Sequence, residues 1–504
     1  MPLRRTFQVL LCCLPVLGLL AAAPGGAEPV PAPGPKEERP VEILHGFDQL
    51  SKESATCVSC HREKSPGIYD QWGDSKHFGA NVGCYECHKA GPGDKDAIQH
   101  KDFTIAVIVS PKDCANCHER EVKEFDASHH ATAGNILGSL DNHLAEVIEG
   151  GPLLNGTSPV VTMGCAGCHG SIVRVNSDGT LNTATWPNTG IGRINPDGSK
   201  GSCSACHLRH NFDSAQARNP DNCGRCHLGP DHPQKEIYEE SAHGVAYRAH
   251  VDKMNLDSDK WIVGEDYTAA PTCATCHMSR TKDLPVTHDV GNRISWDLRS
   301  PVSAKIDAKA IAAGKSVKPW LERRKDMKNV CTACHGRNVP DAHFEQLDAF
   351  VALYNDKFAI PSKKLFDTML EAGLRDKVQF NEKVEWVYFY LWHHEGRRAR
   401  HGAAMFAPDY VHWEGLYEVA HRFYMELVPA VEAAIAKARG AGNAAGADKV
   451  QAALDATLNS EMHRWYLGQE PPAYWKPTDD DSHGYHISKS RPAPENAALG
   501  TEKK

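Results

Sequence analysis

The feature that most constrains this chain is a short cysteine motif that occurs eight times. The sequence of 504 residues contains 18 cysteines, and two of them, Cys12 and Cys13, lie in an apolar N-terminal stretch. The other sixteen form eight Cys-x-x-Cys pairs, and a histidine directly follows every pair. Cys-x-x-Cys-His is the attachment motif of c-type haem: both cysteines bond to the macrocycle and the histidine becomes an axial ligand of the iron. A zinc site also uses cysteine and histidine, but it does not explain the constant offset of the histidine. The motif residues are Cys57, Cys60 and His61; Cys84, Cys87 and His88; Cys114, Cys117 and His118; Cys165, Cys168 and His169; Cys203, Cys206 and His207; Cys223, Cys226 and His227; Cys273, Cys276 and His277; and Cys331, Cys334 and His335.

The spacing of these motifs limits the kind of core that the chain can form. All eight lie between Cys57 and His335, which leaves about 35 residues for each haem. So little chain per haem cannot bury a large aliphatic core, so the macrocycles themselves are expected to fill the interior. We therefore expect a mainly α-helical multihaem cytochrome c with a haem-packed core, formed by an octahaem domain over residues 46–340.

The pattern of the chain changes after the eighth motif. Segments such as FEQLDAFVALYNDKF and LYEVAHRFYMELVPAVEAAIAKA have apolar residues at helical spacing, and Pro361, Pro408 and a Gly/Ala-rich stretch interrupt them. This predicts a C-terminal, haem-free bundle of long helices over residues 341–470, which suits a subunit interface. An extended tail over residues 471–504 is expected to follow, because it is polar and contains proline.

The N-terminus has the composition of an export signal. Two arginines precede an apolar stretch, and small residues follow it. This predicts a signal peptide over residues 1–27 and a Pro-rich leader over residues 28–45, and hence a periplasmic protein. A retained membrane anchor is the alternative, but the apolar stretch is short and contains a proline. No later segment is apolar enough to span a membrane, and the net charge of −8 offers no basic surface for nucleic acid.

Twenty histidines lie outside the motifs, and some of them are expected to be second axial ligands of haem iron. His77, His130 and His243 each end the pattern aromatic-x-x-Ser-x-His, 12 to 16 residues after a motif histidine. A helix can leave one haem over this distance and present a ligand to another, although stray surface histidines would look the same. His129 is the alternative to His130. The remaining candidates are His100, His210, His288 and either His393 or His394, each with a surface or packing role as the competing interpretation.

The fourth motif is the candidate for an iron with an open coordination position, because no aromatic-x-x-Ser-x-His unit follows it before the fifth motif. Asp231 and His232 stand side by side shortly after the sixth motif. A carboxylate and an imidazole can accept protons from a substrate, and histidine titrates near neutral pH. A surface turn that contains Pro233 is the competing interpretation.

The chain resembles the octahaem hydroxylamine oxidoreductase family of multihaem c-type cytochromes. The resemblance rests on the eight motifs, on the segment GSCSACHLRHNFDSAQARNPDNCGRCHLGPDHPQKEIYEESAHG and on LWHHEGRRARHGAAMFAPDYVHWEG. It implies a mainly helical homotrimer in which the haem of Cys165, Cys168 and His169 is catalytic. It also implies that Asp231 and His232 belong to the pocket of that haem.

The resemblance gives Tyr410 a particular role. Members of the family that oxidise hydroxylamine or hydrazine have a tyrosine bonded covalently to the catalytic haem of a neighbouring subunit, and Tyr410 occupies the matching position. Members that reduce nitrite or hydroxylamine lack this tyrosine, so its presence favours oxidation. A further pocket tyrosine is expected shortly after the eighth motif, but Val339 lies in that region and no tyrosine does. This departure bears on whether the product is nitric oxide or nitrite.

These inferences together predict a hydroxylamine dehydrogenase with His169, Asp231, His232 and Tyr410 at its catalytic site. Seven haems with two histidine ligands each would pass the electrons to a cytochrome c. Three other functions compete with this one: a hydrazine dehydrogenase with the same crosslinked haem, a reductive octahaem enzyme acting on nitrite or hydroxylamine, and an electron conduit without an open haem.

Overall fold

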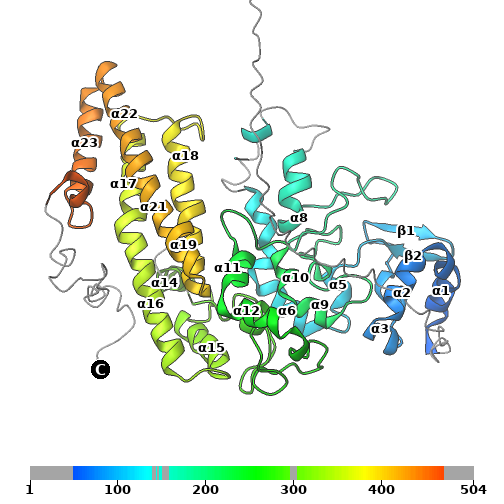
Figure 1. Ribbon diagram of the computed structural model, residues 1–504. Coiled ribbons are helices and arrows are strands. Elements are labelled where there is room, and N and C mark those ends of the chain that lie inside the picture. The colour runs from blue at the N-terminus through cyan, green and yellow to red at the C-terminus, as the bar shows by residue number, and fades with distance from the viewer. Residues whose placement is uncertain (1–48, 139–143, 145–146, 150–157, 296–303, 470–504) are drawn as a thin grey trace, which may run out of the picture. The chain divides into compact units, whose positions relative to one another are not determined.

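The computed structural model describes residues 49–138, 144, 147–149, 158–295 and 304–469. The signal peptide, the leader and the tail predicted from the sequence lie outside these residues. Within them the chain is mainly helical, as predicted, and two short strands, β1 (Ala97–His100) and β2 (Phe103–Ala106), pair in antiparallel fashion (Figure 1).

The region that contains the first seven haem motifs consists of short helices joined by loops, and the eighth motif begins at the end of a later helix, Trp320–Thr332 (Figure 1). Several motifs are themselves single helical turns, because α4, α8 and α13 each end on a motif histidine. In a helix, residues three and four positions apart share one face, so the turn directs both cysteines and the histidine to the same side. The helices of this region are α1 (Lys52–Lys64), α2 (Pro66–Gly73), α3 (Lys76–Gly79), α4 (Cys84–His88), α5 (Pro111–Cys114), α6 (Glu119–Ala127), α8 (Ala166–His169), α9 (Ser214–Arg218), α10 (Pro220–Gly224), α11 (Gln234–Glu240), α12 (Ala242–Ala249) and α13 (Cys273–His277).

The C-terminal region contains the long helices (Figure 1). Several of them continue into one another through π-helical turns, in which one extra residue widens the turn. The α-helices are α14 (Ala304–Ala312), α15 (Trp320–Thr332), α16 (Asn338–Tyr354), α17 (Ile360–Glu371), α18 (Lys383–Phe389), α19 (Gly396–Met405), α20 (Pro408–Val411), α21 (Glu418–His421), α22 (Val428–Gly440) and α23 (Ala444–Leu458). The π-helical turns between them are η6 (Asn355–Ala359), η7 (Tyr390–Glu395), η8 (His412–Tyr417) and η9 (Arg422–Leu427).

Pro361 and Pro408 differ in their effect on the helices of this region. Pro361 was expected to interrupt a helix, but α16, η6 and α17 form one continuous helical run through it. A proline inside a helix clashes with the carbonyl four residues earlier, and the preceding π turn moves that carbonyl away. Pro408 does separate two helices, since α19 ends at a left-handed Phe406 (φ 68°) before α20 begins.

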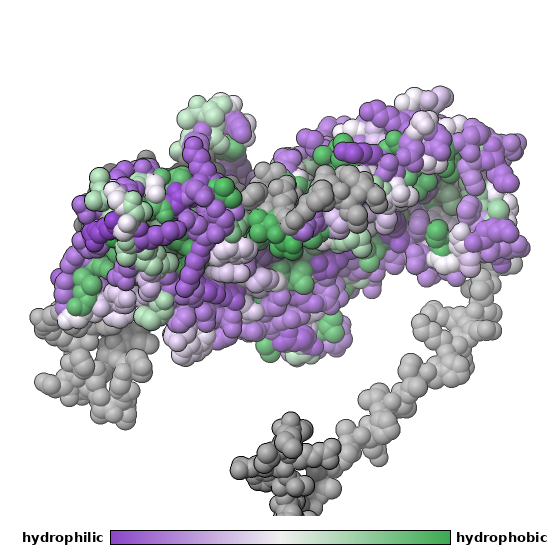
Figure 2. Space-filling model, turned by 90° about the horizontal axis from the view of Figure 1, so that it is seen from above, coloured by the Kyte–Doolittle hydropathy of each residue, from purple (hydrophilic) through white to green (hydrophobic). Residues whose placement is uncertain are grey.

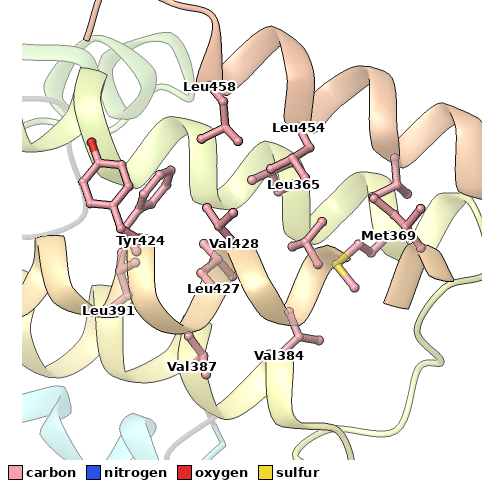
Figure 3. Packing of buried hydrophobic residues seen from close by; sticks show 14 of the residues in the cluster. Leu365, Met369, Val384, Val387, Leu391, Tyr424, Leu427, Val428, Leu454 and Leu458 are labelled. Atoms are coloured by element: carbon pink, nitrogen blue, oxygen red, sulfur yellow. The ribbon is translucent and has the colours of Figure 1, made fainter. Parts of the chain in front are cut away.

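Apolar core residues are concentrated late in the chain. The largest cluster is formed by the helical runs α16–η6–α17, α18–η7 and α21–η9–α22 together with α23, and it includes Leu365, Leu391, Leu427 and Leu454 (Figure 3). A second cluster runs from Tyr238 to Ala274. Among the described residues, no apolar cluster of this kind involves the chain before Tyr238. The region with the densest haem motifs therefore lacks an aliphatic core of its own, as expected of an interior that the macrocycles fill.

The surface mixes hydrophilic residues with hydrophobic patches on the face shown in Figure 2. One set of exposed apolar side chains lies along the continuous helical segment formed by η8, α21 and η9. Trp413, Tyr417 and Met425 are each more than half exposed, and their spacing of four or eight residues puts them on one helical face. In the part of the chain that the structure describes, no helix is long and apolar enough to cross a membrane.

Candidate functional site

Six motif histidines lie opposite a second histidine. In each pair the two ring centroids are 6.1–6.5 Å apart, and the ring of His227 additionally lies 6.4 Å from that of His232 in an edge-on arrangement. All six partners are histidines that the sequence marked as candidate axial ligands. The pairs are His61 with His100, His118 with His77, His88 with His210, His227 with His130, His207 with His288, and His335 with His243.

The separation within these pairs fits a haem iron between the two rings. A metal–imidazole nitrogen bond is about 2.0–2.1 Å long, and the ring centre lies roughly 1.1 Å beyond the nitrogen. Two imidazoles on opposite sides of one metal ion are therefore expected to have centroids about 6.2–6.4 Å apart. The observed range of 6.1–6.5 Å includes this value. The residues thus fit six haems with two histidine ligands each.

The repeated serine explains how three of these ligands are presented. Ser75, Ser128 and Ser241 each donate a hydrogen bond from Oγ to the carbonyl of the aromatic residue three positions earlier, at 2.6–2.7 Å. Ser75 and Ser241 also accept a hydrogen bond from the backbone N–H three positions later, at 3.1 Å. The serine therefore ends one helix and caps the next, and the histidine two residues on lies in the first turn of the new helix.

Several motif histidines also have a defined partner for Nδ1. When Nε2 binds iron, Nδ1 carries the proton and is oriented by the group that accepts it. His88 Nδ1 lies 2.8 Å from the carbonyl oxygen of Ala106, and His277 bonds to the backbone of Val290. His227 instead interacts with the side chain of Gln234, which also lies 3.4 Å from His401 Nε2. The sixth motif thus differs in having a side-chain amide beside its histidine.

Cysteines of different motifs lie near one another, and their nearness defines an order of the motifs. The first, second, third, fifth, sixth, seventh and eighth motifs follow one another as a series. The fourth motif joins this series at the sixth. The contacts are Cys57 with Cys84, Cys87 with Cys114, Cys114 with Cys203, Cys206 with Cys223, Cys223 with Cys273, Cys276 with Cys331, and Cys168 with Cys226.

A loop packs tightly against the fourth motif. Backbone N–H groups of Ile191 and Gly192 donate to the carbonyls of Cys168 and His169 at 2.9 and 3.1 Å. A Cβ atom on Gly190 would lie 2.0 Å from the backbone nitrogen of Gly170, so only glycine allows this approach. The helical turn that presents His169 is therefore held in place by backbone contacts.

Asp231 and His232 lie in the turn between the sixth motif and α11. His232 Nδ1 and Asp231 Oδ1 are in direct hydrogen-bond contact. The second carboxylate oxygen of Asp231 accepts a hydrogen bond from Arg397 at 3.1 Å and lies 3.7 Å from His393 Nδ1. His232 also lies near Cys168 of the fourth motif, and its ring is 6.4 Å from that of His227 of the sixth motif. The two residues that the sequence marked as a proton-accepting pair are thus joined, and they lie beside the fourth motif.

The charges in this cluster give Asp231 and His232 different roles in proton transfer. Burial disfavours the charged form of Asp231, but His232, His393 and Arg397 together hold the pKa of its carboxyl well below the usual range. Burial alone would lower the pKa of His232, and the contact with Asp231 outweighs it and raises the pKa. Asp231 therefore stays ionised near neutral pH. His232 is the member of the pair suited to accepting a proton, through Nε2.

The structure locates the other predicted site residues as follows. His393 and His394 lie in η7, where His393 stacks on Phe389 with a centroid distance of 4.3 Å and approaches Asp231. Val339 lies in the first turn of α16 and is nearly half exposed. Arg397 was not predicted, because a charged residue in an amphipathic helix has no local signal for a partner more than 160 residues away.

Tyr410 lies in α20, beside a hollow of about 470 Å³ that is also lined by Glu236, Glu239, Glu240 and Arg248. Burial and the neighbouring glutamates raise the pKa of its hydroxyl to about 12. The hydroxyl is therefore protonated near neutral pH. The surroundings of Tyr410 are a partly open surface formed with α11 and α12.

Comparisons with known proteins support a multihaem cytochrome. A family described as seven times multi-haem cytochrome CxxCH matches residues 197–381, and a family described as cytochrome c554 and c-prime matches residues 113–208. A probable nitrite reductase-hydroxylamine oxidoreductase fusion protein of Kuenenia stuttgartiensis is 26% identical over an alignment of 349 positions, and the match covers 58% of this chain and 35% of that protein. The chain thus spans about a third of the length of this relative.

Two solved structures share the fold. One, called a hypothetical multiheme protein, has a TM-score of 0.64 and 27% identity, and the match covers 76% of this chain and 97% of the other. The second, a reducing HAO-like protein complex of Kuenenia stuttgartiensis, has a TM-score of 0.55 and 19% identity, with 79% and 87% covered. From the motifs, their geometry and these matches, the chain is a mainly helical multihaem cytochrome that holds several c-type haems.

Proposed function

We propose that this protein is an exported octahaem oxidoreductase that oxidises hydroxylamine at the fourth haem, bound by Cys165, Cys168 and His169. The observation that carries the proposal is the hydrogen-bonded pair Asp231 and His232, which interacts with Cys168. When bound, the fourth haem supplies the redox centre that takes up electrons from the substrate. The name of the fusion-protein relative, which includes hydroxylamine oxidoreductase, agrees with this substrate class.

The residues of the pocket account for the protons. Oxidation of hydroxylamine removes protons together with electrons: removing three electrons gives nitric oxide, and removing four with addition of water gives nitrite. His232 accepts a proton at Nε2, because its Nδ1 is engaged by Asp231. Asp231 keeps its negative charge and stabilises the imidazolium that forms, as the acid of a catalytic triad does.

The series of motifs gives the electrons a route. The fourth motif meets the sixth through Cys168 and Cys226, so the haem of His227 is the first relay. From there the motif contacts lead both toward the fifth and toward the seventh motif. We propose that all eight motifs hold haem, that seven of these haems are relays and that a cytochrome c accepts the electrons outside the cell membrane.

We also propose a homotrimer in which Tyr410 reaches the fourth haem of a neighbouring subunit. Tyr410 lies at a partly open surface, and the exposed side chains of Trp413 and Tyr417 follow it on the same helical run. Exposed aromatic residues of this kind are enriched in subunit interfaces. A second subunit over this surface would cover them.

A reductive enzyme is the second candidate function. It is favoured by the relatives whose names contain nitrite reductase or reducing. The presence of Tyr410 argues for the oxidative direction, and a hydrazine dehydrogenase would share every feature named above. Rates of electron transfer to cytochrome c with hydroxylamine and with hydrazine, and rates of nitrite reduction with a reduced donor, separate the three enzymes.

The Tyr410 bond is tested by replacing the residue with phenylalanine. The haem-loaded wild-type protein, boiled in denaturant, should migrate on a gel as a crosslinked oligomer, whereas Tyr410→Phe should migrate as a monomer and lose hydroxylamine oxidation. Tyr466→Phe, which removes a hydroxyl from a partly buried tyrosine of the same bundle, serves as the control. A wild-type monomer on this gel, or full activity of Tyr410→Phe, would show that the oxidative proposal is wrong. Failure of cyanide to bind any haem would instead favour the electron conduit.

A further inference from the structure

The C-terminal bundle contributes a charged residue to the pocket. Arg397, near the start of α19, donates a hydrogen bond to Asp231 at 3.1 Å across a sequence separation of 166 residues. Less than a fifth of either side chain is exposed. An ion pair at this depth is weakly screened by water and fixes the geometry of both partners more firmly than a surface pair does.

The two oxygens of the Asp231 carboxylate have different partners. Oδ1 contacts His232 Nδ1, and Oδ2 accepts from Arg397 and faces His393. Because Arg397 holds one oxygen, rotation of the carboxylate away from His232 would break an ion pair inside the protein. The orientation of the His232 ring therefore depends on a residue that does not touch it directly.

The π turn η7 determines where Arg397 points. Each residue of an α-helix rotates the chain by about 100°, so one extra residue before α19 rotates all that follows by that amount. Arg397 comes two residues after the end of η7. Its guanidinium also lies 5.6 Å from the ring of Trp392, which is within the π turn. The turn thus aims the guanidinium at Asp231 and gives it an aromatic neighbour.

We propose that Arg397 is a positioning residue that holds the Asp231 carboxylate so that His232 presents Nε2 to the ligand of the fourth haem. The proposal rests on the proposed function, because it takes His232 as the proton acceptor. Arg397 itself exchanges no proton. Lysine would be a poor substitute, because its ammonium group lacks the planar fork that binds a carboxylate and stacks on an aromatic ring.

The test measures proton transfer at the pocket without turnover. Hydrogen cyanide loses its proton when it binds a ferric haem as cyanide, so a correctly oriented base speeds the association. Stopped-flow rates of cyanide binding to the oxidised, fully haem-loaded protein are compared for Arg397→Met, Arg397→Lys and Asp231→Asn. The control is Arg439→Gln, which removes an arginine–aspartate contact of the same 3.1 Å length from the exposed surface. Haem content per chain, measured for every variant, ensures that only loaded protein is compared.

Arg397→Met should slow cyanide association and hydroxylamine turnover by at least about tenfold, the order expected for a misplaced catalytic group. Asp231→Asn should slow both at least as much, and Arg439→Gln should leave both unchanged. Arg397→Lys should slow association by at least about threefold. If Arg397→Met does not load haem, the rate of cyanide binding to Arg397→Lys decides whether Arg397 positions Asp231.

The test distinguishes a failure of the Arg397 proposal from a failure of the proposed function. If Arg397→Met, or Arg397→Lys in its place, binds cyanide at the wild-type rate while Asp231→Asn is slow, Arg397 does not position the pair and the present proposal is refuted. If Asp231→Asn also binds cyanide and oxidises hydroxylamine at wild-type rates, the pair is not the proton acceptor. The mechanism under the proposed function then fails together with this inference.

Discussion

Removal of His130 is expected to open a coordination position on the sixth haem. The ring of His130 faces the ring of His227 at a centroid distance of 6.1 Å. Burial of the His130 side chain lowers the pKa of His130 to about 4. A neutral imidazole at this distance is suited to iron ligation. The His130→Ala variant keeps Cys223, Cys226 and His227, so the haem should remain attached by both thioether bonds and one axial ligand.

The size of the opening follows from the same distance. Half of the 6.1 Å separation, about 3 Å, is the depth from the expected iron position to the centre of the ring that is removed. This depth accommodates a diatomic ligand such as carbon monoxide. One site per chain changes, so the variant should bind one more equivalent of carbon monoxide per chain than the wild-type protein, whatever number the wild type binds.

The assay is a carbon monoxide titration of the dithionite-reduced protein, with haem content measured on the same samples. His129→Ala is the matched control, because His129 is the adjacent histidine and is exposed. It should leave the uptake unchanged. Equal uptake by His130→Ala and wild type, at equal haem content, would refute the assignment of His130. An extra equivalent in His129→Ala would reverse the two assignments.

Two further predictions concern stability and potential. Asp348→Ala leaves the buried guanidinium of Arg324 without its two bonds of 2.6 and 2.8 Å, and it should lower the free energy of unfolding by about 3–5 kcal/mol. Urea unfolding followed by circular dichroism measures this loss of stability. As a control, breaking the exposed ion pair between Lys449 and Glu371 should lower the free energy of unfolding by about 1 kcal/mol or less. Gln234→Leu replaces the polar amide near His227 by an apolar side chain, which disfavours the extra positive charge of the ferric state, and should raise the potential of the sixth haem in a redox titration. An unchanged potential would exclude this effect.

Local patterns were sufficient to predict, as a set, the histidines that lie opposite six motif histidines. The motif cysteines and histidines are linked by helical spacing, and the serine of the repeat caps the helix that begins one residue before His77. Both are short-range effects, so they are visible in the sequence. The same holds for the bundle, whose apolar periodicity reflects faces that pack on each other (Figure 3).

The pairing of ligands with motifs could not be predicted, because it depends on contacts between distant segments. His210 follows the fifth motif directly, yet it faces His88 of the second. His288 follows the seventh motif and faces His207 of the fifth. Proximity along the chain therefore indicates that a histidine is near haems in general, whereas the tertiary fold decides which iron it reaches.

The limits of sequence reasoning are greatest at Asp231, where the bundle and the haem region meet. The separation of these regions in the sequence suggested a haem-free bundle concerned with subunit contacts. In the structure, Arg397 and His393 also bring the bundle into contact with Asp231. Their positions depend on a π turn, and no residue pattern in the sequence distinguished it from continuous α-helix.

The position of the fourth motif beside the series, and not within it, has a consequence for the proposed chemistry. Oxidation of hydroxylamine delivers several electrons in close succession, and a centre that cannot pass them on at once would hold a partly oxidised substrate. The sixth motif lies near the fourth, the fifth and the seventh, so under the proposed function a haem held by the sixth motif would have two routes by which electrons could leave. If the substrate-binding haem were inside a linear series, its iron would have to bind substrate and also carry electrons that come from other haems. Under the proposed function, a substrate-binding haem on a branch would not have to carry electrons that come from other haems.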